Sequence, residues 1–207
     1  MKRLLILFLF ALTSLTTMHA QTGIGLTISN DLYNRYVNPK DGIESPSNGS
    51  VLLNLAIGPK IWLGSESFSF SAEAQANWGI LALSLADYKG LGSASFPIMG
   101  KFNFAGLSGL NKEGRFGFSI GGGIQFNKTE IYYQTNDFKD KGGERSFFKT
   151  YVIQAGYGFG ISGFTMHGFV KYGFDPDVDG ASNLHIGIQY DFNIPKLSKI
   201  SDPASAL

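Results

Sequence analysis

Asn183-Leu-His-Ile-Gly-Ile-Gln-Tyr-Asp-Phe192 is the stretch of the chain that decides its fold class. Every second residue from Leu184 to Phe192 is apolar, and polar residues or glycine stand between them. Because successive side chains of a strand point to opposite faces, this pattern predicts a strand with one apolar and one polar face. The two aromatic residues at its end, Tyr190 and Phe192, suit the aromatic girdle of a membrane interface. We therefore expect this strand to close a transmembrane barrel.

The composition of the 207-residue chain agrees with a barrel in lipid. It contains 18 Phe, 9 Tyr and 27 Gly, whereas only 16% of its residues are charged. A soluble domain rarely combines so many Phe with so few charges, but a barrel whose outer face contacts lipid needs this mixture. The formal net charge of +1 gives no basic excess for binding nucleic acid. The absence of Cys excludes disulfides and thiolate metal sites.

Residues 1–20 are expected to be a cleaved secretory signal peptide. Lys2 and Arg3 form its charged start, the run 4–12 is almost wholly apolar, and the more polar stretch that follows ends at Ala20. An uncleaved membrane anchor is the alternative, but the apolar run is too short to span a bilayer comfortably.

Residues 21–194 are expected to form one all-β domain, an eight-stranded antiparallel transmembrane β-barrel with up-and-down topology. Period-2 apolar segments predict strands at 23–33, 50–63, 67–83, 95–104, 115–133, 147–161, 164–174 and 183–192. The short links between them are 64–67, 107–114 and 162–163, and the long ones are 34–49, 84–94, 134–146 and 175–182. Short turns in the periplasm and long loops outside are typical of outer-membrane barrels, and an even strand count returns both termini to the periplasm.

The polar faces of these strands predict a lumen filled by side chains. We expect its network to contain six residues: Glu73, Lys101, His167, Lys171, Gln189 and Asp191. The expected ion pairs are Glu73 with Lys101 and Lys171 with Asp191. His167 is expected to pair with Asp191 or Gln189. An eight-stranded barrel is normally filled by side chains, so this pattern favours a plugged lumen over a narrow channel for protons or ions.

Two further features have structural interpretations. Trp62 and Trp78 are expected to mark the depth of the membrane interface. The run Gly121–Gly123 precedes no predicted helix and so lacks the context of a phosphate-binding loop. We expect it to permit close strand packing or a bend.

The polar residues form no recognisable catalytic motif. His167 and His185 are the two His residues after the signal peptide, and both lie on predicted polar faces. Ser182 precedes His185, but it lies in a predicted loop, and the sequence indicates no positioned acid partner. We therefore expect no enzymatic activity and no cofactor, with an envelope enzyme that modifies lipid as the alternative.

Two loops and the C-terminal tail are further candidates for function. The loop 134–146 has mixed charge, and it is expected either to bind a surface partner by strand addition or to be a solvated loop. Asp175, Asp177 and Asp179, followed by Gly, match the first half of a calcium loop, but the expected bidentate Glu is missing. These residues therefore predict either a weak Ca²⁺ site or an acidic turn. The tail 195–207 is expected to be disordered in the periplasm.

Three segments resemble strands of the Bacteroidetes-type outer-membrane β-barrel proteins. Ala94–Phe104 is similar to their fourth strand, Gly117–Phe126 to their Gly-rich fifth strand, and His185–Phe192 to the signal by which the barrel assembly machinery reads a final strand. The resemblance covers about 21–192. It implies a small eight-stranded barrel of the OmpX/OmpA type in the outer membrane of a Gram-negative bacterium. Members of the family act in adhesion, secretion support or envelope stability.

These features together predict a non-enzymatic, monomeric outer-membrane β-barrel with a structural or surface-interaction role. Its expected partners are the lipid bilayer with its lipopolysaccharide, the assembly machinery through 185–192, and a surface partner at 134–146, without nucleic acid. The open alternatives are the lipid-modifying enzyme, a narrow channel and a barrel that assists secretion.

Overall fold

A computed structural model describes residues 21–37, 48–83, 90–140, 147–178 and 180–200. The strands are β1 (Gln21–Val37), β2 (Asn48–Gly64), β3 (Phe68–Ala74), β4 (Ala76–Leu83), β5 (Leu91–Ala105), β6 (Arg115–Tyr132), β7 (Phe148–Ile161), β8 (Phe164–Phe174) and β9 (Ser182–Asn193). The short helices are η2 (Gly106–Ser108), α2 (Asn136–Asp140) and α3 (Ile194–Ile200). None of the helices in the described ranges is long and apolar enough to cross a bilayer.

The strands form a closed antiparallel ring. β3 and β4 both pair with β2 and β5, and every other strand pairs with the strand before it and the strand after it. β1 closes the ring by pairing with β2 and with β9, from Gly25 opposite Asn193 to Val37 opposite Ser182. This closure confirms the predicted up-and-down β-barrel, because it leaves the ring without a free edge.

β3 and β4 together are the predicted third strand, so the ring has eight staves. The interruption lies at Gln75, whose N–H donates to the carbonyl oxygen of Pro97 at 3.0 Å. Pro97 has no N–H to return the second hydrogen bond of this pair, so the ladder weakens at this one position. Pairing with β2 and β5 continues on both sides of it.

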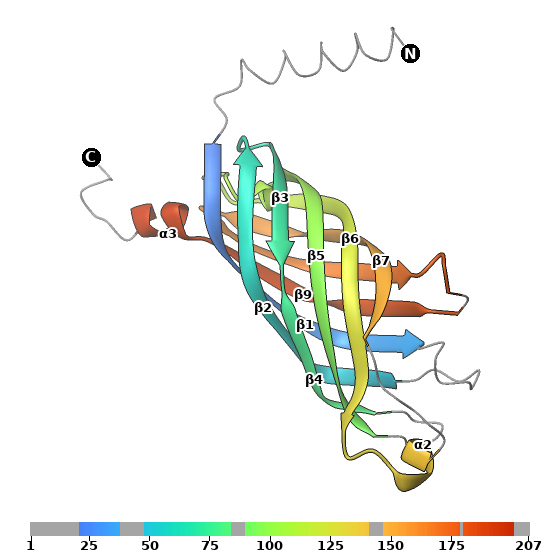
Figure 1. Ribbon diagram of the computed structural model, residues 1–207. Coiled ribbons are helices and arrows are strands. Elements are labelled where there is room, and N and C mark those ends of the chain that lie inside the picture. Colours follow the sequence, from blue (N-terminus) through green and yellow to red (C-terminus); the bar gives the residue numbers. More distant parts are fainter. Residues whose placement is uncertain (1–20, 38–47, 84–89, 141–146, 179, 201–207) are drawn as a thin grey trace, which may run out of the picture.

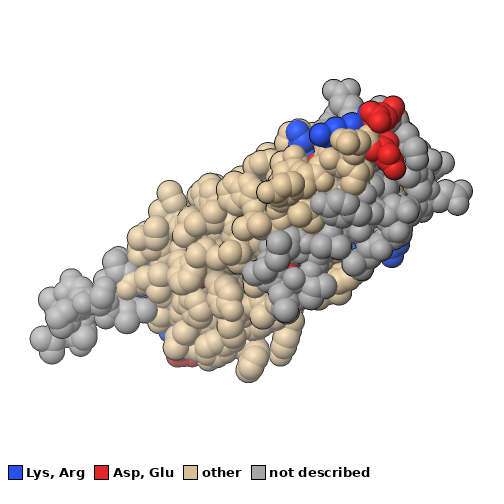
Figure 2. Space-filling model, turned by 90° about the horizontal axis from the view of Figure 1, so that it is seen from below, with Lys and Arg blue, Asp and Glu red and all other residues tan. Residues whose placement is uncertain are grey.

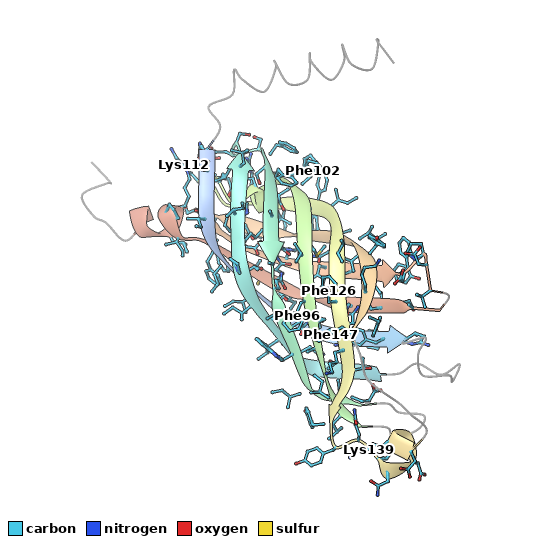
Figure 3. The ribbon with its side chains drawn as sticks, in the orientation of Figure 1. Phe96, Phe102, Lys112, Phe126, Lys139 and Phe147 are labelled. Atoms are coloured by element: carbon cyan, nitrogen blue, oxygen red, sulfur yellow. The ribbon has the colours of Figure 1, made fainter. Side chains whose placement is uncertain are left out.

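Burial alternates along the strands in the opposite sense to a soluble protein. Large apolar side chains are exposed on the outside, for example Ile80 (63%), Phe116 (63%) and Tyr157 (65%). Asn, Gln, Ser, Thr, Lys and Glu side chains are buried inside. Figure 3 shows Phe102 on the outer wall. The predicted facing of the two sides of each strand is therefore confirmed.

The height of the apolar wall matches a membrane. On β6 the apolar outer face runs from Phe116 to Phe126, and only Lys128 beyond it carries a charge on that face. The residue steps between the two Phe, at about 3.3 Å each and tilted by about 40°, span about 25 Å along the membrane normal. This is the height of the apolar band of an outer-membrane barrel.

The two ends of the barrel differ. Figure 1 shows the start of β1 and helix α3 at the end of the short turns, and α2 at the opposite end, where the long links lie. The turn predicted at 107–114 is more than a surface turn, because Leu107 and Leu110 are 2% and 0% exposed. Together with η2, this segment folds into the end of the barrel and closes it.

The C-terminal prediction needs a correction. The tail 195–207 was expected to be disordered, but its first residues form α3, which contacts β1 and β9. The Lys196 ammonium donates a hydrogen bond to Gln21 Oε1 at 2.7 Å. The predicted signal peptide 1–20 and the end of the tail, 201–207, lie outside the described residues.

The topology makes a labelling prediction. A Cys at Lys139, on the exposed helix α2, should react with a membrane-impermeant maleimide on intact cells, because α2 lies at the end of the long loops. A Cys at Glu113, exposed at the end of the short turns, should react only after the cells are lysed. The native chain has no Cys and provides a clean background. The reverse labelling pattern would invert the barrel.

Candidate functional site

The centre of the lumen is a cluster of four charges. The Lys60 ammonium lies 2.9 Å from Glu73 Oε2 and 2.8 Å from Asp191 Oδ2. The Lys101 ammonium lies 2.6 Å from Glu73 Oε1. These four side chains are at most 3% exposed, and their formal charges sum to zero. The cluster is therefore neutral as a unit, which is the condition for burying charge without a large free-energy cost.

Gln189 connects the members of this charge cluster. Its amide nitrogen donates to Glu73 Oε2 at 3.1 Å and to Asp191 Oδ1 at 2.8 Å. Its amide oxygen accepts from Lys101 at 3.0 Å and from Gln154 at 3.3 Å. Because both ends of the amide are used, the cluster is a connected network, which stabilises buried polar groups better than isolated pairs do.

A second group of polar side chains lies farther along the lumen, around Asp31. Asp31 Oδ2 lies 2.5 Å from His185 Nδ1 and accepts from Asn77 at 2.9 Å. The other ring nitrogen of His185 lies 3.0 Å from Gln125 Nε2. The Tyr36 ring meets the His185 ring edge to face, with centroids 5.2 Å apart. Asp31, Gln125 and Tyr36 therefore fix the orientation of the His185 ring.

The six predicted lumen residues all lie inside the barrel, but their pairing differs in part. Glu73 contacts Lys101 as expected, whereas Asp191 pairs with Lys60 in place of Lys171. Lys171 is buried in the lumen. Both ring nitrogens of His167 lack a hydrogen bond, so the expected bond to Asp191 or Gln189 is not formed.

Among the members of these networks that the sequence does not predict as site residues, Lys60 and Asp31 are the two that form ion pairs through a Lys or Asp side chain. Lys60 stands on the polar face of its strand, so alternation marked it as inward. Its partner Asp191 is 131 positions away, and only the strand register shows that the two side chains meet. Asp31 supplies the acid partner of His185 that the sequence did not indicate.

Glycines on the inner faces of β6 and β7 provide the space for the long polar side chains. A Cβ added at Gly121 would lie 2.6 Å from Lys101 Cγ, and one at Gly156 would lie 2.7 Å from His167 Cδ2. Both distances are shorter than a normal van der Waals contact, so a larger residue would displace the lumen side chain. The predicted role of the Gly run in close strand packing agrees with this.

Trp62 belongs to the closed end of the barrel. It is 2% exposed and lies against Gly109, where an added Cβ would be 2.7 Å from the indole nitrogen. The Asn193 side chain donates to the Gly109 carbonyl at 2.9 Å, and Ser69 Oγ donates to the Ser108 carbonyl at 2.6 Å. The prediction that Trp62 marks the membrane interface is wrong, because Trp62 lies on the inner face of β2 and its side chain points into the lumen. Trp78, by contrast, is 48% exposed on the outer face.

The acidic loop after β8 forms a turn in its described part. The Asp177 N–H donates to Asp175 Oδ1 at 3.1 Å, as in an Asx turn. Asp179 lies outside the described residues. No group of three or more His, Cys, Asp or Glu side chains that could hold a metal occurs among the residues that the structure describes. Calcium binding at Asp175, Asp177 and Asp179 stays a prediction.

His185 and Ser182 do not form a nucleophile–base pair. His185 contacts Asp31 and Gln125 through its two ring nitrogens, so neither faces a hydroxyl. Ser182 starts β9 on the outer face of the barrel, away from the inward-facing His185. The contacts of His185 are therefore an ion pair and an amide contact, and Ser182 takes no part in them.

The barrel and its lumen define the class of the protein. An apolar wall about 25 Å tall around a polar, neutralised interior is the arrangement of a transmembrane β-barrel, and single-chain barrels with an even number of strands belong to the bacterial outer membrane. The chain is thus an eight-stranded β-barrel of the outer membrane of a Gram-negative bacterium.

Comparisons with known proteins find similarity only in structure. The N-terminal β-barrel domain of Pseudomonas aeruginosa OprF is 9% identical, with a TM-score of 0.43 over 83% of this chain and 100% of that chain. Ail, the attachment invasion locus protein of Yersinia pestis, solved with the heparin analogue sucrose octasulfate, is 12% identical, with a TM-score of 0.39 over 83% and 99%. OprG of Pseudomonas aeruginosa is 12% identical, with a TM-score of 0.39 over 84% and 95%. No family model and no curated protein sequence matches the chain. The class stated above rests on the geometry of the barrel itself.

The charge cluster makes a stability prediction. Lys101→Met should lower the free energy of unfolding by about 3 kcal/mol, because it leaves the buried cluster with one excess negative charge. The double variant Lys101→Met/Glu73→Gln restores neutrality and should recover most of the loss. Urea unfolding of the refolded barrel in lipid vesicles measures both. A Lys101→Met variant as stable as the native chain would contradict the role of the cluster.

The glycines make a second prediction with a matched control. Gly121→Ala should destabilise the barrel by about 2 kcal/mol, because the added methyl group would lie 2.3 Å from the Gly100 carbonyl oxygen and 2.6 Å from Lys101 Cγ. Gly168→Ala, on the outer face where the nearest atom to an added Cβ is 3.9 Å away, should change stability by less than about 0.5 kcal/mol. The temperature at which the folded band disappears on gels reports both variants. Equal effects of the two variants would contradict close packing at Gly121.

Proposed function

We propose that this chain is a monomeric, non-enzymatic outer-membrane barrel with a plugged lumen, acting as a structural or surface-interaction protein. The observation that carries the proposal is the buried cluster of Lys60, Glu73, Lys101 and Asp191, which fills the middle of the lumen. The segment around η2 adds a second obstruction at the end of the short turns. With the lumen filled, the surfaces left for interaction are the outer wall and the long loops.

The long loop after β6 is the proposed surface for a partner. The pairing of β6 with β7 ends at Asn127 opposite Phe148, whereas its pairing with β5 continues to Leu91 opposite Tyr132. The last residues of β6 therefore extend beyond the first residue of β7. A strand edge in this position favours strand addition by an extended partner segment. The loop 134–146, which contains α2, follows directly.

The remaining expected partners belong to the same proposal. The segment 185–192 lies in β9, the strand that closes the ring, and its alternation of polar and apolar residues suits recognition by the barrel assembly machinery. Lipopolysaccharide would contact the apolar wall at the end of the long loops. The signal peptide 1–20 and membership of the Bacteroidetes-type family are part of the proposal on the strength of the sequence.

The plugged lumen makes a conductance prediction. The refolded chain should show no stepwise current in planar bilayers, because charged side chains occupy the lumen centre. The control variant Glu73→Ala/Lys101→Ala stays neutral but removes two long side chains, and it should pass a small current.

Two results would count against this proposal. Discrete channels from the native chain would favour the narrow-channel alternative. Altered lipid A acylation in a deletion strain, measured by mass spectrometry, would favour the enzyme.

A further inference from the structure

Two Lys and two Phe side chains lie next to one another on the outer face of the barrel, near the end of β6 and the start of β7. Phe126 stands opposite Lys149, and Lys128 lies one position farther along the same face, beside Phe147. We call Phe126, Lys128, Phe147 and Lys149 the rim quartet. Phe126 and Phe147 are seen on this wall in Figure 3, together with Phe96 of β5. The two Lys residues are diagonal neighbours, at the range of about 7–8 Å typical of such cross-strand positions.

The two ammonium groups of the rim quartet are held by aromatic rings. Lys128 Nζ lies 5.5 Å from the centroid of Phe147, and Lys149 Nζ lies 4.8 Å from the centroid of Tyr151. The Phe147 ring also packs on Phe96, with centroids 6.0 Å apart. Cation–π contacts at these distances orient the Lys side chains along the wall. Both cations are therefore positioned before any ligand arrives.

The rim quartet lies at the boundary of the apolar wall. Phe126 is the last apolar residue of the straight outer face of β6, and Lys128 follows it on the side of the long loops. Since the wall below is about 25 Å tall, the ammonium groups stand at the level of lipid headgroups in the outer leaflet. The aromatic rings beneath them stand at the level where acyl chains begin.

Positive charge at the rim quartet is poorly compensated by the protein. The outer faces of the described strands carry no Asp or Glu. Asp177 Oδ2 lies 3.9 Å from Lys149 Nζ, but the Asp177 side chain is 77% exposed, so this ion pair contributes little. No acidic side chain in the described ranges pairs with Lys128. Figure 2 shows a largely uncharged wall, with most of the visible Lys, Arg, Asp and Glu at one end of the molecule and a few at the other.

We propose that Lys128 and Lys149 bind the phosphate monoester of an acylated lipid in the outer leaflet, with an acyl chain lying against Phe96 and Phe126. Lys is an effective point-charge ligand for phosphate, and two ammonium groups match the charge of a phosphate monoester. The aromatic floor continues into the apolar wall, which suits a ligand that has a charged head and an apolar tail. The inference rests on the membrane orientation of the proposed function.

Binding of lipid A tests this site. The full mature chain, refolded in phosphatidylcholine nanodiscs, is titrated with lipid A or with the same lipid after removal of its phosphates, and binding is measured by native mass spectrometry. The native chain should bind lipid A about tenfold more tightly than the dephosphorylated lipid. Lys128→Gln/Lys149→Gln should abolish this difference, whereas Lys128→Arg/Lys149→Arg should retain it.

Two matched variants control for general loss of positive charge. Lys139→Gln on α2 and Lys112→Gln at the opposite end of the barrel, both labelled in Figure 3, should bind lipid A like the native chain. The heat-modifiable band on gels shows, independently of lipid A, that each variant is a folded barrel, so failure of the lipid site is distinguishable from failure of the proposed function. Equal binding of the two lipids by the native chain would overturn the proposal. Displacement of lipid A by millimolar inorganic phosphate would also overturn it, because it would assign the site to free phosphate.

Discussion

Neutralisation of charge inside a narrow barrel is the constraint on which the rest of this structure depends. Lys60, Glu73, Lys101 and Asp191 come from four different staves and meet at distances of 2.6–2.9 Å, away from solvent. Removing any one of them would leave an uncompensated charge at the level of the membrane. The strand register brings these four residues together. Glycines leave room beside Lys101 and His167. Both ends of the Gln189 amide form hydrogen bonds to the cluster.

The filled lumen has a consequence for function. The charge cluster occupies the middle of the lumen, and His185, the His of the described residues that has an acid partner, also contacts Gln125 and Tyr36. η2 and Trp62 also close one end of the barrel. We therefore propose sites for partners and lipid on the outside of the barrel, at the long loops and the rim quartet.

The outer wall is uniform along most of its height and specialised at its boundary. Alternating large apolar residues meet lipid with no charge between them, because an unpaired charge near the bilayer midplane costs several kcal/mol. Where the wall ends, Lys128 and Lys149 take up positions over aromatic rings. The same strands thus present apolar side chains below and cations above, and on β6 the change occurs within two residues, from Phe126 to Lys128.

The sequence by itself determined the barrel, the number of its staves and the facing of nearly every strand residue, because a period of two is a local property that survives any choice of partner strand. It also indicated the Glu73–Lys101 pair, which lies on adjacent staves. Only the tertiary structure decided that Asp191 meets Lys60 and that His185 meets Asp31, because these contacts cross the lumen or join the first and last strands. It likewise decided that Trp62 and the segment around η2 close one end, and that α3 begins the tail. Such contacts depend on strand register and ring closure. A local sequence pattern contains no information on these, because the contacting residues are 131 or 154 positions apart.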